Sequence, residues 1–236
     1  MEFSIDNDFA LFYGIMLGDG CLSLVKGKKK FISISGSIYD DLDFYQKIIL
    51  PILFRLRGKS TNIKFRKKEG KIELNFVDQK LFDFINSIGF PIGKKGSNIV
   101  IPEIFYQKGL VKEVIQGYFS TDGSIVLTRN PDKLYPRLEI HGISAPLIKQ
   151  SYDFFVKNGL YGHFYLCKRN KVDIRWQDKY RVQFNGIRNL LIYKILIGFV
   201  NPKHLRKFID FQNYLDQYPK KVKVTAGSAD LPTSCL

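Results

Sequence analysis

The chain has 236 residues, of which 45% are hydrophobic and 14% aromatic, so it can bury a substantial core and global disorder is excluded. Its 37 Lys and Arg residues exceed its 22 Asp and Glu residues by 15, which favours a polyanionic partner because neutralised phosphates release bound counterions. Three isolated cysteines and three isolated histidines argue against a zinc site or a disulfide framework and favour a reducing compartment.

The N-terminal residues 1–6 lack the basic and apolar blocks of a signal peptide. The longest apolar run, around residues 190–200, is interrupted by Tyr193, Lys194 and Gly198 and is too short for a membrane span. We therefore expect a soluble, intracellular protein, cytoplasmic or organellar if the host is a eukaryote, with no membrane partner.

The first distinctive element is an apolar stretch that ends in Phe-Tyr-Gly-Ile-Met-Leu-Gly-Asp-Gly at residues 12–20. An alternating segment at 31–37 predicts a strand, and apolar residues at helical spacing over 42–52 predict a helix. Residues 61–66 and 71–77 predict a second hairpin, since Gly70 suits the turn between them. A helix then leads to Ile-Gly-Phe at 88–90.

The same order of elements returns after a short, partly apolar connector at 97–109. Residues 115–123 read Ile-Gln-Gly-Tyr-Phe-Ser-Thr-Asp-Gly and match the first motif in their apolar, Gly, small and Asp-Gly positions. Residues 137–142 predict a strand, 147–156 a helix, 162–168 and 172–185 a hairpin, and a further helix leads to Ile-Gly-Phe at 197–199. A last helix is predicted over 202–217.

This duplication predicts an α+β fold of two pseudo-symmetric αββαββα halves. We place the first half at 1–97, a linker at 98–109, the second half at 110–218 and a poorly ordered tail at 219–236. Small residues four apart on each motif helix, at 14 and 18 and at 117 and 121, would let the two helices approach closely about a pseudo-two-fold axis.

The two motif aspartates, Asp19 and Asp122, stand where each motif helix ends. A carboxylate there opposes the helix dipole at a cost of about 0.3–1 kcal/mol, and paired helices bring the two like charges together. One Asp-Gly pair would usually be only a turn, but the same pair in both copies favours a site for hard divalent cations such as Mg²⁺.

These motifs, the duplication and the order of elements resemble the LAGLIDADG homing endonucleases over nearly the whole chain except the tail. The resemblance implies motif helices at the interface, antiparallel sheets that form a DNA-binding saddle, and a monomer that cuts a long asymmetric double-stranded target. It implies Mg²⁺-dependent hydrolysis of both strands across a minor groove, leaving 3′ overhangs, with Mn²⁺ as a substitute and Ca²⁺ supporting binding without cleavage. Asp19 and Asp122 would be the catalytic metal ligands, and the carbonyls of Gly18 and Thr121 secondary ligands.

The resemblance also implies a basic residue near each scissile phosphate, for which Lys94 and Lys203 are the first candidates and Lys95 the second. The chain departs from the family's pattern at the end of the second strand of each half. Family members often carry Gln or Lys there, whereas this chain has Gly36-Ser37 and Gly142-Ile143. The residue that positions the attacking water stays unassigned, with Ser35 and His141 as weak substitutes.

The strand sequences alternate apolar with polar residues, as expected of a sheet with one face on the core and one face open. Lys, Arg, Asn and Gln on that face can contact phosphates and the base edges of a major groove. The predicted DNA-binding residues are Lys28, Lys29, Lys30, Lys64, Arg66, Lys67, Lys68, Lys71, Glu73, Asn75, Arg129, Arg137, Lys168, Arg169, Arg175, Arg181, Gln183 and Asn185.

Other functions stay open on the sequence. The same scaffold could serve as an RNA maturase or as a DNA-binding protein that does not cut, and an unrelated metal nuclease would need the repeat to be a coincidence. An endonuclease embedded in a self-splicing protein is disfavoured, because the chain has no splicing flank and does not end in His-Asn.

Overall fold

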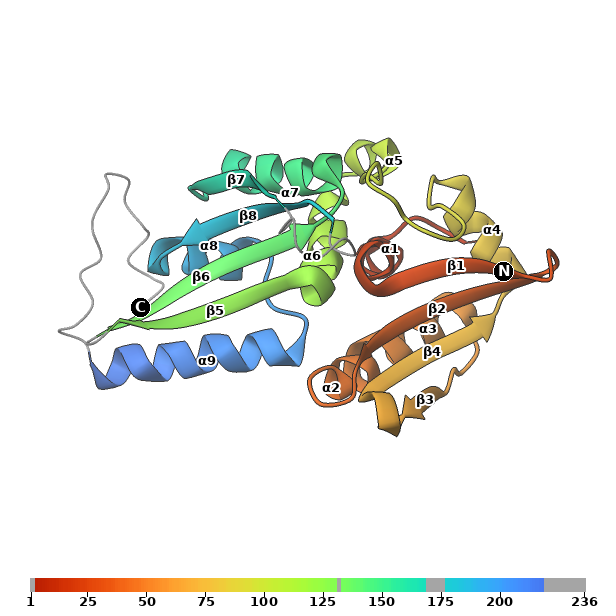
Figure 1. Ribbon diagram of the computed structural model, residues 1–236, viewed down its shortest axis with the longest axis horizontal. Helices are drawn as coiled ribbons and strands as arrows, with labels where there is room; N and C mark the ends of the chain where they lie inside the picture. Colours follow the sequence, from red (N-terminus) through yellow and green to blue (C-terminus); the bar gives the residue numbers. More distant parts are fainter. Residues whose placement is uncertain (1–2, 131–132, 169–176, 219–236) are drawn as a thin grey trace.

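The computed structural model describes residues 3–130, 133–168 and 177–218, which form two similar halves side by side (Figure 1). The first half contains α1 (Asn7–Asp19), β1 (Gly20–Val25), β2 (Lys29–Ser37), α2 (Leu42–Phe44), α3 (Leu50–Arg57), β3 (Ile63–Arg66), β4 (Lys71–Val77) and α4 (Gln79–Ser87). After α5 (Glu103–Gln107), the second contains α6 (Val111–Asp122), β5 (Gly123–Asn130), β6 (Lys133–Gly142), α7 (Ala145–Lys157), β7 (Gly162–Cys167), β8 (Lys179–Asn185), α8 (Ile187–Leu196) and α9 (Pro202–Gln217).

Each half is built on an antiparallel sheet with the same topology. Within the described residues the strand orders are β1-β2-β4-β3 and β5-β6-β8-β7, and each sheet has four strands. This confirms the predicted α+β fold with two αββαββα halves, to which α5 and α9 are added. Strand β8 begins at Lys179, and residues 172–176 of the predicted strand lie outside the described residues.

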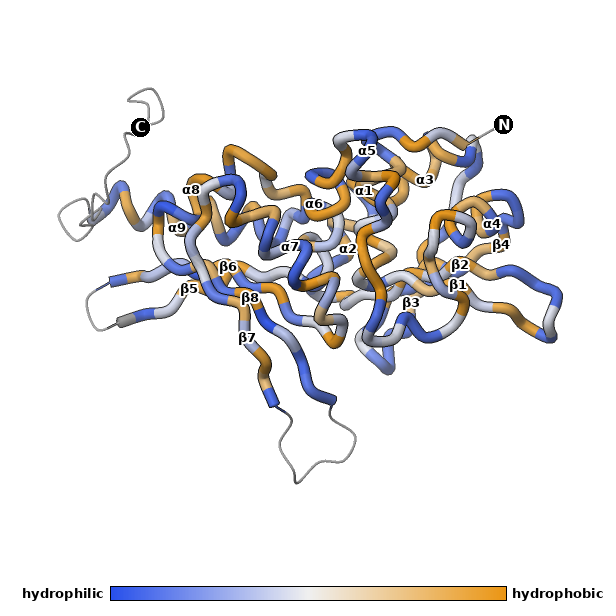
Figure 2. The backbone as a smooth tube through the Cα atoms, turned by 90° about the horizontal axis from the view of Figure 1, so that it is seen from above, coloured by the Kyte–Doolittle hydropathy of each residue, from blue (hydrophilic) through white to orange (hydrophobic). Residues whose placement is uncertain are grey.

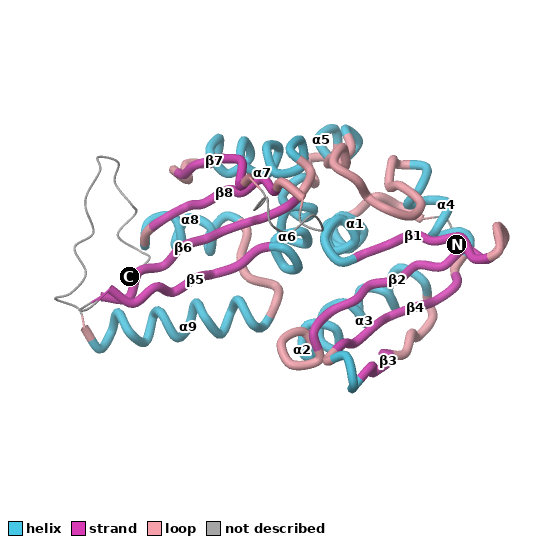
Figure 3. Tube along the Cα trace, in the orientation of Figure 1, coloured by secondary structure: helices cyan, strands magenta, loops and turns pink. Residues whose placement is uncertain are grey.

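The helices gather on one side of both sheets and leave the other side open (Figures 2 and 3). Ile72 and Leu74 on β4 and Val182 on β8 are fully buried, while their polar neighbours lie on the open face. The alternation on β3 is weaker than predicted, because Phe65 on this edge strand is 48% exposed. In the described ranges, no helix has both the length and the apolar character needed to cross a bilayer.

The two motif helices α1 and α6 pack directly on each other between the halves (Figure 1). A Cβ atom at Gly14 would collide with the Val114 carbonyl and lie 2.9 Å from the Tyr118 nitrogen, so backbone touches backbone there. A Cβ atom at Gly117 would likewise collide with the Leu11 carbonyl. The small residues predicted from the motifs therefore do allow this approach, which larger side chains would prevent.

The helix after the first hairpin is less regular than its counterpart α7. A π-helical turn at Tyr45–Ile49 separates α2 from α3, and the Leu50 amide donates to the Tyr45 carbonyl. Pro51 explains this turn, since it has no amide hydrogen for the helical ladder and its ring crowds the preceding turn. In α7 the proline, Pro146, stands in the first turn, where it disturbs nothing.

The connector between the halves is folded onto both of them. Phe105 on α5 is fully buried, with its ring centroid 4.9 Å from that of Tyr13 on α1. The backbone of Ile101 exchanges two hydrogen bonds with the side chain of Gln150 on α7, at 2.8 and 3.1 Å. The connector is therefore an ordered segment that contacts both halves.

Candidate metal and nucleic-acid site

Asp19 and Asp122 are the last residues of α1 and α6, and the glycine after each begins a strand. Both glycines are extended, with φ of −84° at Gly20 and −83° at Gly123, so neither forms a left-handed helix cap. Glycine is needed for space, because a Cβ atom at Gly20 would lie 2.5 Å from Met16 Cα. The tight turn holds each carboxylate at the junction between helix and sheet.

The packing of α1 on α6 brings the two carboxylates to one place. A Cβ atom at Gly18 would lie 3.4 Å from the carboxyl carbon of Asp122 and would collide with Thr121 Oγ1. Burial, followed by the negative charges of Asp122 and Asp41, raises the pKa of Asp19 to about 7. Burial also raises the pKa of Asp122, against the opposing effect of Lys95 and a hydrogen bond from Tyr118. Two partly buried acids therefore share a site that favours a cation.

Lys95 lies beside these acids, whereas Lys94, the first candidate from the sequence, is exposed to solvent. The Lys95 ammonium donates to the carbonyls of Leu17, at 2.9 Å, and Gly18, at the end of α1. Its charge opposes the rise in pKa of both aspartates. Burial lowers the pKa of Lys95 itself, while the two aspartates oppose that shift. The Gly18 carbonyl, a predicted secondary metal ligand, thus accepts a hydrogen bond from an ammonium.

Lys203, the predicted counterpart in the second half, reaches across to the first half. Its ammonium donates to Asp41 Oδ1 at 2.8 Å, and Asp41 Oδ2 accepts from the Ser37 amide at 2.9 Å. The positive charge of Lys203 lowers the pKa of both motif aspartates, so it lies within electrostatic range of them. The sequence reading missed Asp41, since it lies in a loop with no counterpart in the repeat.

The end of α6 is stabilised differently from the end of α1. The side-chain amide of Asn201, at the start of α9, donates to the Ser120 carbonyl at 2.8 Å. His204, which occupies the place of Lys95 in the repeat, is 2% exposed and packs edge-on against Phe119. Burial lowers the pKa of His204 to about 3, so its ring is neutral near pH 7. The two halves therefore carry unequal charge around the shared acids.

The donors available for a metal are the two aspartates and backbone carbonyls. In the ranges that the structure describes, no cluster of three or more His, Cys, Asp or Glu side chains could hold an ion. A site of this kind suits Mg²⁺, which keeps several waters and completes its shell with a substrate phosphate. The residues present therefore fit a hard divalent cation that is bound together with a phosphate.

On the first sheet, the predicted DNA-binding residues divide into exposed and tethered side chains. Lys28, Lys29, Lys64, Lys67 and Lys68 are exposed at strand ends and hairpin tips. Arg66 pairs with Glu73 at 3.0 Å and Lys71 with Glu69 at 3.4 Å. Asn75 lies on the open face of β4, with its Oδ1 atom buried. Lys30 instead pairs with Asp83 on α4 at 2.5 Å, which turns its ammonium toward the helix layer.

On the second sheet, Arg137, Arg181, Gln183 and Asn185 lie together on the open face, on the paired strands β6 and β8. Both arginines form ion pairs with Glu139, which is 4% exposed. Arg129 and Lys168 are exposed at strand ends, and the predicted Arg169 and Arg175 lie outside the described residues, as does the tail 219–236. Sequence reasoning missed Glu139, although it lies at the polar position between Arg137 and His141.

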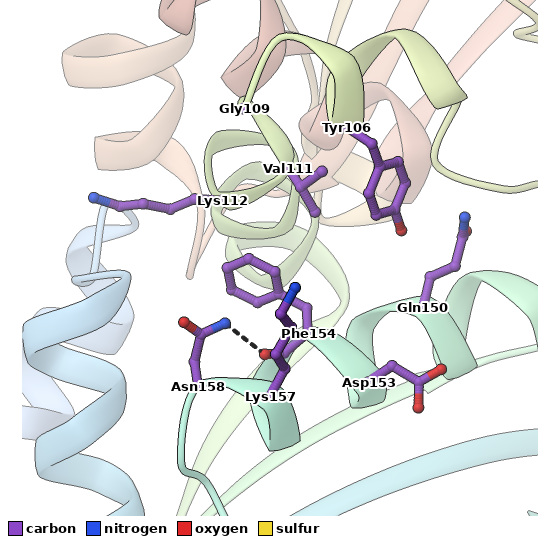
Figure 4. Close-up of a pocket in the computed structure, with 9 residues that line it drawn as sticks. All are labelled: Tyr106, Gly109, Val111, Lys112, Gln150, Asp153, Phe154, Lys157 and Asn158. Atoms are coloured by element: carbon purple, nitrogen blue, oxygen red, sulfur yellow. Dashed lines mark hydrogen bonds between the residues drawn. The ribbon is translucent and has the colours of Figure 1, made fainter.

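A cavity of about 520 Å³ opens at the other end of α6, lined by residues of α5, α6 and α7 that include Tyr106, Lys112 and Gln150 (Figure 4). Asp122 ends the same helix, so the cavity-lining residues Val111 and Lys112 lie roughly 16 Å from it along the helix at about 1.5 Å per residue. The cavity is separate from the candidate metal site.

No family model matches the chain. Solved structures of three LAGLIDADG-type endonucleases are similar to it. I-DmoI aligns with a TM-score of 0.57 and 16% identity over 81% of this chain and 95% of that chain. I-AabMI, bound to uncleaved DNA, aligns with a TM-score of 0.58 and 15% identity over 92% and 93%. I-WcaI, bound to its DNA recognition sequence, aligns with a TM-score of 0.55 and 13% identity over 88% and 87%. The chain therefore has the fold of the LAGLIDADG homing endonucleases, as its sequence predicts.

One curated protein, a probable translation initiation factor IF-2 of Methanocaldococcus jannaschii, is 29% identical over 230 residues. The match covers 92% of this chain but 18% of that protein. The chain thus spans about a fifth of that relative's length.

Proposed function

We propose that this chain, with the fold of the LAGLIDADG homing endonucleases, is a homing endonuclease that cuts both strands of a specific DNA target with divalent metal. One observation carries the proposal: Asp19 and Asp122 end two helices in backbone contact, and burial and mutual charge raise the pKa of Asp19 to about 7. Holding two partly buried acids together costs stability, which a bound cation would offset. A purely structural role for this pair has no such compensation.

The proposed metal is Mg²⁺, held by Asp19 and Asp122, with the Thr121 carbonyl as a further oxygen ligand and the Gly18 carbonyl as another once the Lys95 ammonium leaves it. When bound, the metal activates water and stabilises the leaving oxygen of a phosphodiester. I-DmoI has been solved in complex with DNA and Ca, and with DNA and Mn. We propose that Mn²⁺ substitutes for Mg²⁺ in this chain and that Ca²⁺ supports binding without cleavage.

The lysines around the acids supply positive charge for the scissile phosphates, one on each side of the pseudo-two-fold axis. Lys95 takes this role in the first half, because its ammonium lies at the end of α1, and exposed Lys94 becomes the alternative. Lys203 takes it in the second half. His141 is paired with Glu139 at 3.0 Å, which makes it a poor candidate to position water.

The open faces of the two sheets form the proposed DNA-binding saddle. Strands of this kind can enter a major groove, while the acids between the halves face the intervening minor groove, where cutting leaves 3′ overhangs. Since both halves of the site lie in one chain, a monomer suffices. Because the two sheets present different side chains, the target is long and asymmetric.

The test is cleavage of a randomised DNA library with Mg²⁺ by the unaltered chain, Asp19→Asn and Asp122→Asn. We expect each single variant to lose cleavage but keep DNA affinity, since Asn keeps the shape and removes only the charge. Asp40→Asn is the matched control, because Asp40 is an exposed aspartate. This variant should cut DNA normally. Full cutting by either motif variant would disprove the proposal, and binding by the unaltered chain without any cutting would favour a non-cleaving binding protein.

A further inference from the structure

The open face of the second sheet carries a buried carboxylate. Glu139 is 4% exposed, although it alternates on β6 with the core residues Leu138 and Ile140 and so lies on the opposite face of the sheet. Arg137 and Arg181 form ion pairs with its Oε1 atom, and the His141 ring lies 3.0 Å from Oε2. Burial alone would raise the pKa of Glu139, but the contacts with Arg181 and His141 dominate and lower it. The carboxylate is therefore ionised and engaged on both oxygens.

This carboxylate holds two arginines in place through ion pairs. An exposed arginine loses conformational entropy when it binds a base, and a prior ion pair removes part of that cost. Each guanidinium has five N–H donors in a fixed fork, so one carboxylate leaves most of the donors of Arg137 and Arg181 available. Their side chains are 29% and 22% exposed, which leaves part of each open to solvent.

The side-chain amides of Gln183 and Asn185 also use their oxygens for hydrogen bonds within the cluster. Gln183, directly across from Glu139 in the sheet, accepts a hydrogen bond from the Tyr165 hydroxyl at 3.0 Å. Its Nε2 donates to Asn185 Oδ1 at 2.9 Å, so the oxygens of both amides are already engaged. The amide nitrogen of Asn185 adds two further N–H donors. The carboxylate and amide oxygens of this cluster are thus used internally, and the cluster presents donors to a ligand.

We infer that the cluster of Arg137, Glu139, Arg181, Gln183 and Asn185 reads guanine in the major groove. Guanine presents two acceptors there, N7 and O6, which match a guanidinium fork. Cytosine presents a donor and adenine one donor beside its acceptor, so a donor-rich surface disfavours both. The inference rests on the proposed DNA-binding function and names the base preference of one half of the target. Glu139 is the positioning residue, since it acts through the arginines.

The first sheet lacks this arrangement. In the repeat, Phe31 and Ser33 stand in place of Arg137 and Glu139. Glu73 takes the place of Arg181 and pairs with a single arginine, Arg66, whose side chain is 53% exposed. The guanine preference should therefore appear only in the half-site that lies under the second sheet.

The experiment is selection of DNA from a randomised duplex library with Ca²⁺, which requires binding but no cleavage. The unaltered chain should select guanine at one or two neighbouring positions in one half-site. Glu139→Gln should reduce that preference by about fivefold to a hundredfold, the range of a good bidentate base contact, with overall affinity kept. Glu73→Gln is the matched control and should leave these positions unchanged. If Glu139→Gln melts below the assay temperature, Arg181→Lys replaces it, since lysine keeps the charge but loses the fork.

The outcomes separate this inference from the proposed function. Selection of a defined target with no guanine in that half-site would overturn the inference alone. A uniform loss of affinity in Glu139→Gln with the preference unchanged would overturn it too, because that result indicates a structural role. If the unaltered chain selects no sequence at all, the proposed function fails together with the inference.

Discussion

The ammonium of Lys203 lies 2.8 Å from Oδ1 of Asp41, and the two residues belong to different halves of the molecule. Their side chains are 26% and 12% exposed, so the pair is partly shielded from water. A second pair, Arg206 with Asp43 at 3.0 Å, joins the same two elements, α9 and α2, at the surface. The halves are thus linked by charge as well as by the packing of α1 on α6.

Asp41→Asn should destabilise the protein by about 1–3 kcal/mol, because it leaves Lys203 and the Ser37 amide with weaker partners. It should also reduce the turnover of bound DNA more than the affinity, since Lys203 loses its fixed position. Thermal melting and single-turnover cleavage measure the two effects. Asp43→Asn is the control and should change little, because Asp43 lies at the surface, where ion pairs contribute little. Equal effects of the two variants would contradict a special role for Asp41.

Asp19→Asn should stabilise the metal-free protein at pH 8. The folded pKa of Asp19 is raised to about 7, above its ordinary value of 3.8, so the native state binds this proton more tightly than the unfolded chain. The associated stability is present at low pH and is lost as the pH rises from about 4 to 7. Melting curves at pH 4 and pH 8 should show the variant gaining only at pH 8, and Ca²⁺ should raise the melting temperature of the unaltered chain alone. An equal gain at both pH values would be inconsistent with this origin.

Gly14→Ala should destabilise the packing of α1 on α6, although alanine is the better helix former by about 1 kcal/mol. The new Cβ atom would collide with the backbone of α6 at Val114 and Tyr118, which cannot move aside as a side chain can. Crowding of this kind costs about 1–3 kcal/mol. Gly27→Asn is the control, since nothing lies within 4 Å of a Cβ atom at Gly27 and Asn tolerates its φ of +68°. A more stable Gly14→Ala variant would refute the close approach of the helices.

His204 should make the protein acid-labile. Burial lowers its folded pKa to about 3 from an ordinary 6.5, so the unfolded chain binds this proton more readily than the native state. Stability therefore falls as the pH drops from about 6.5 to 3. His204→Gln should flatten this part of the curve of unfolding free energy against pH. His163→Gln, at an exposed histidine on β7, should leave the curve unchanged.

Replacing Lys67 and Lys68 with alanine should weaken binding to all DNA sequences. Both are exposed at the tip of the β3–β4 hairpin, where they can contact phosphates without reading bases. The slope of log affinity against log salt should fall by about two if both contact phosphates. The control replaces Lys108 and Lys112, two exposed lysines beside α5 and on α6, and should leave the slope unchanged. An unchanged slope for the hairpin variant would place the DNA elsewhere.

The repeat made most of the fold predictable, because each strand or helix pattern occurs in both halves and each copy supports the assignment of the other. Helix α9 begins and ends where the sequence places it, at Pro202 and Gln217. The π-helical turn before Pro51 was not predicted, since Pro51 has no counterpart in the second half and the apolar spacing continues through it.

The site was predictable only where the repeat marks it. Asp19 and Asp122 stand in matched motifs, whereas Asp41 and Lys203 meet across 162 residues of sequence, and no local pattern reports such a pair. Adjacent Lys94 and Lys95 show the same limit, because a turn decides which of the two side chains reaches the end of α1. Glu139 is one of several polar residues in its strand, and the sequence does not single it out. Its burial depends on Arg181, a residue of another strand.

The close contact of α1 with α6 divides the chain into parts with unequal freedom to mutate. Gly14, Gly18 and Gly117 admit no larger side chain, so substitutions there disturb the acids and the core together. Side chains on the open sheet faces contact water on one side and can be exchanged without such a penalty. Under the proposed function, a lineage of this protein can drift to a new DNA target while its cutting machinery stays fixed, and each sheet can do so independently of the other.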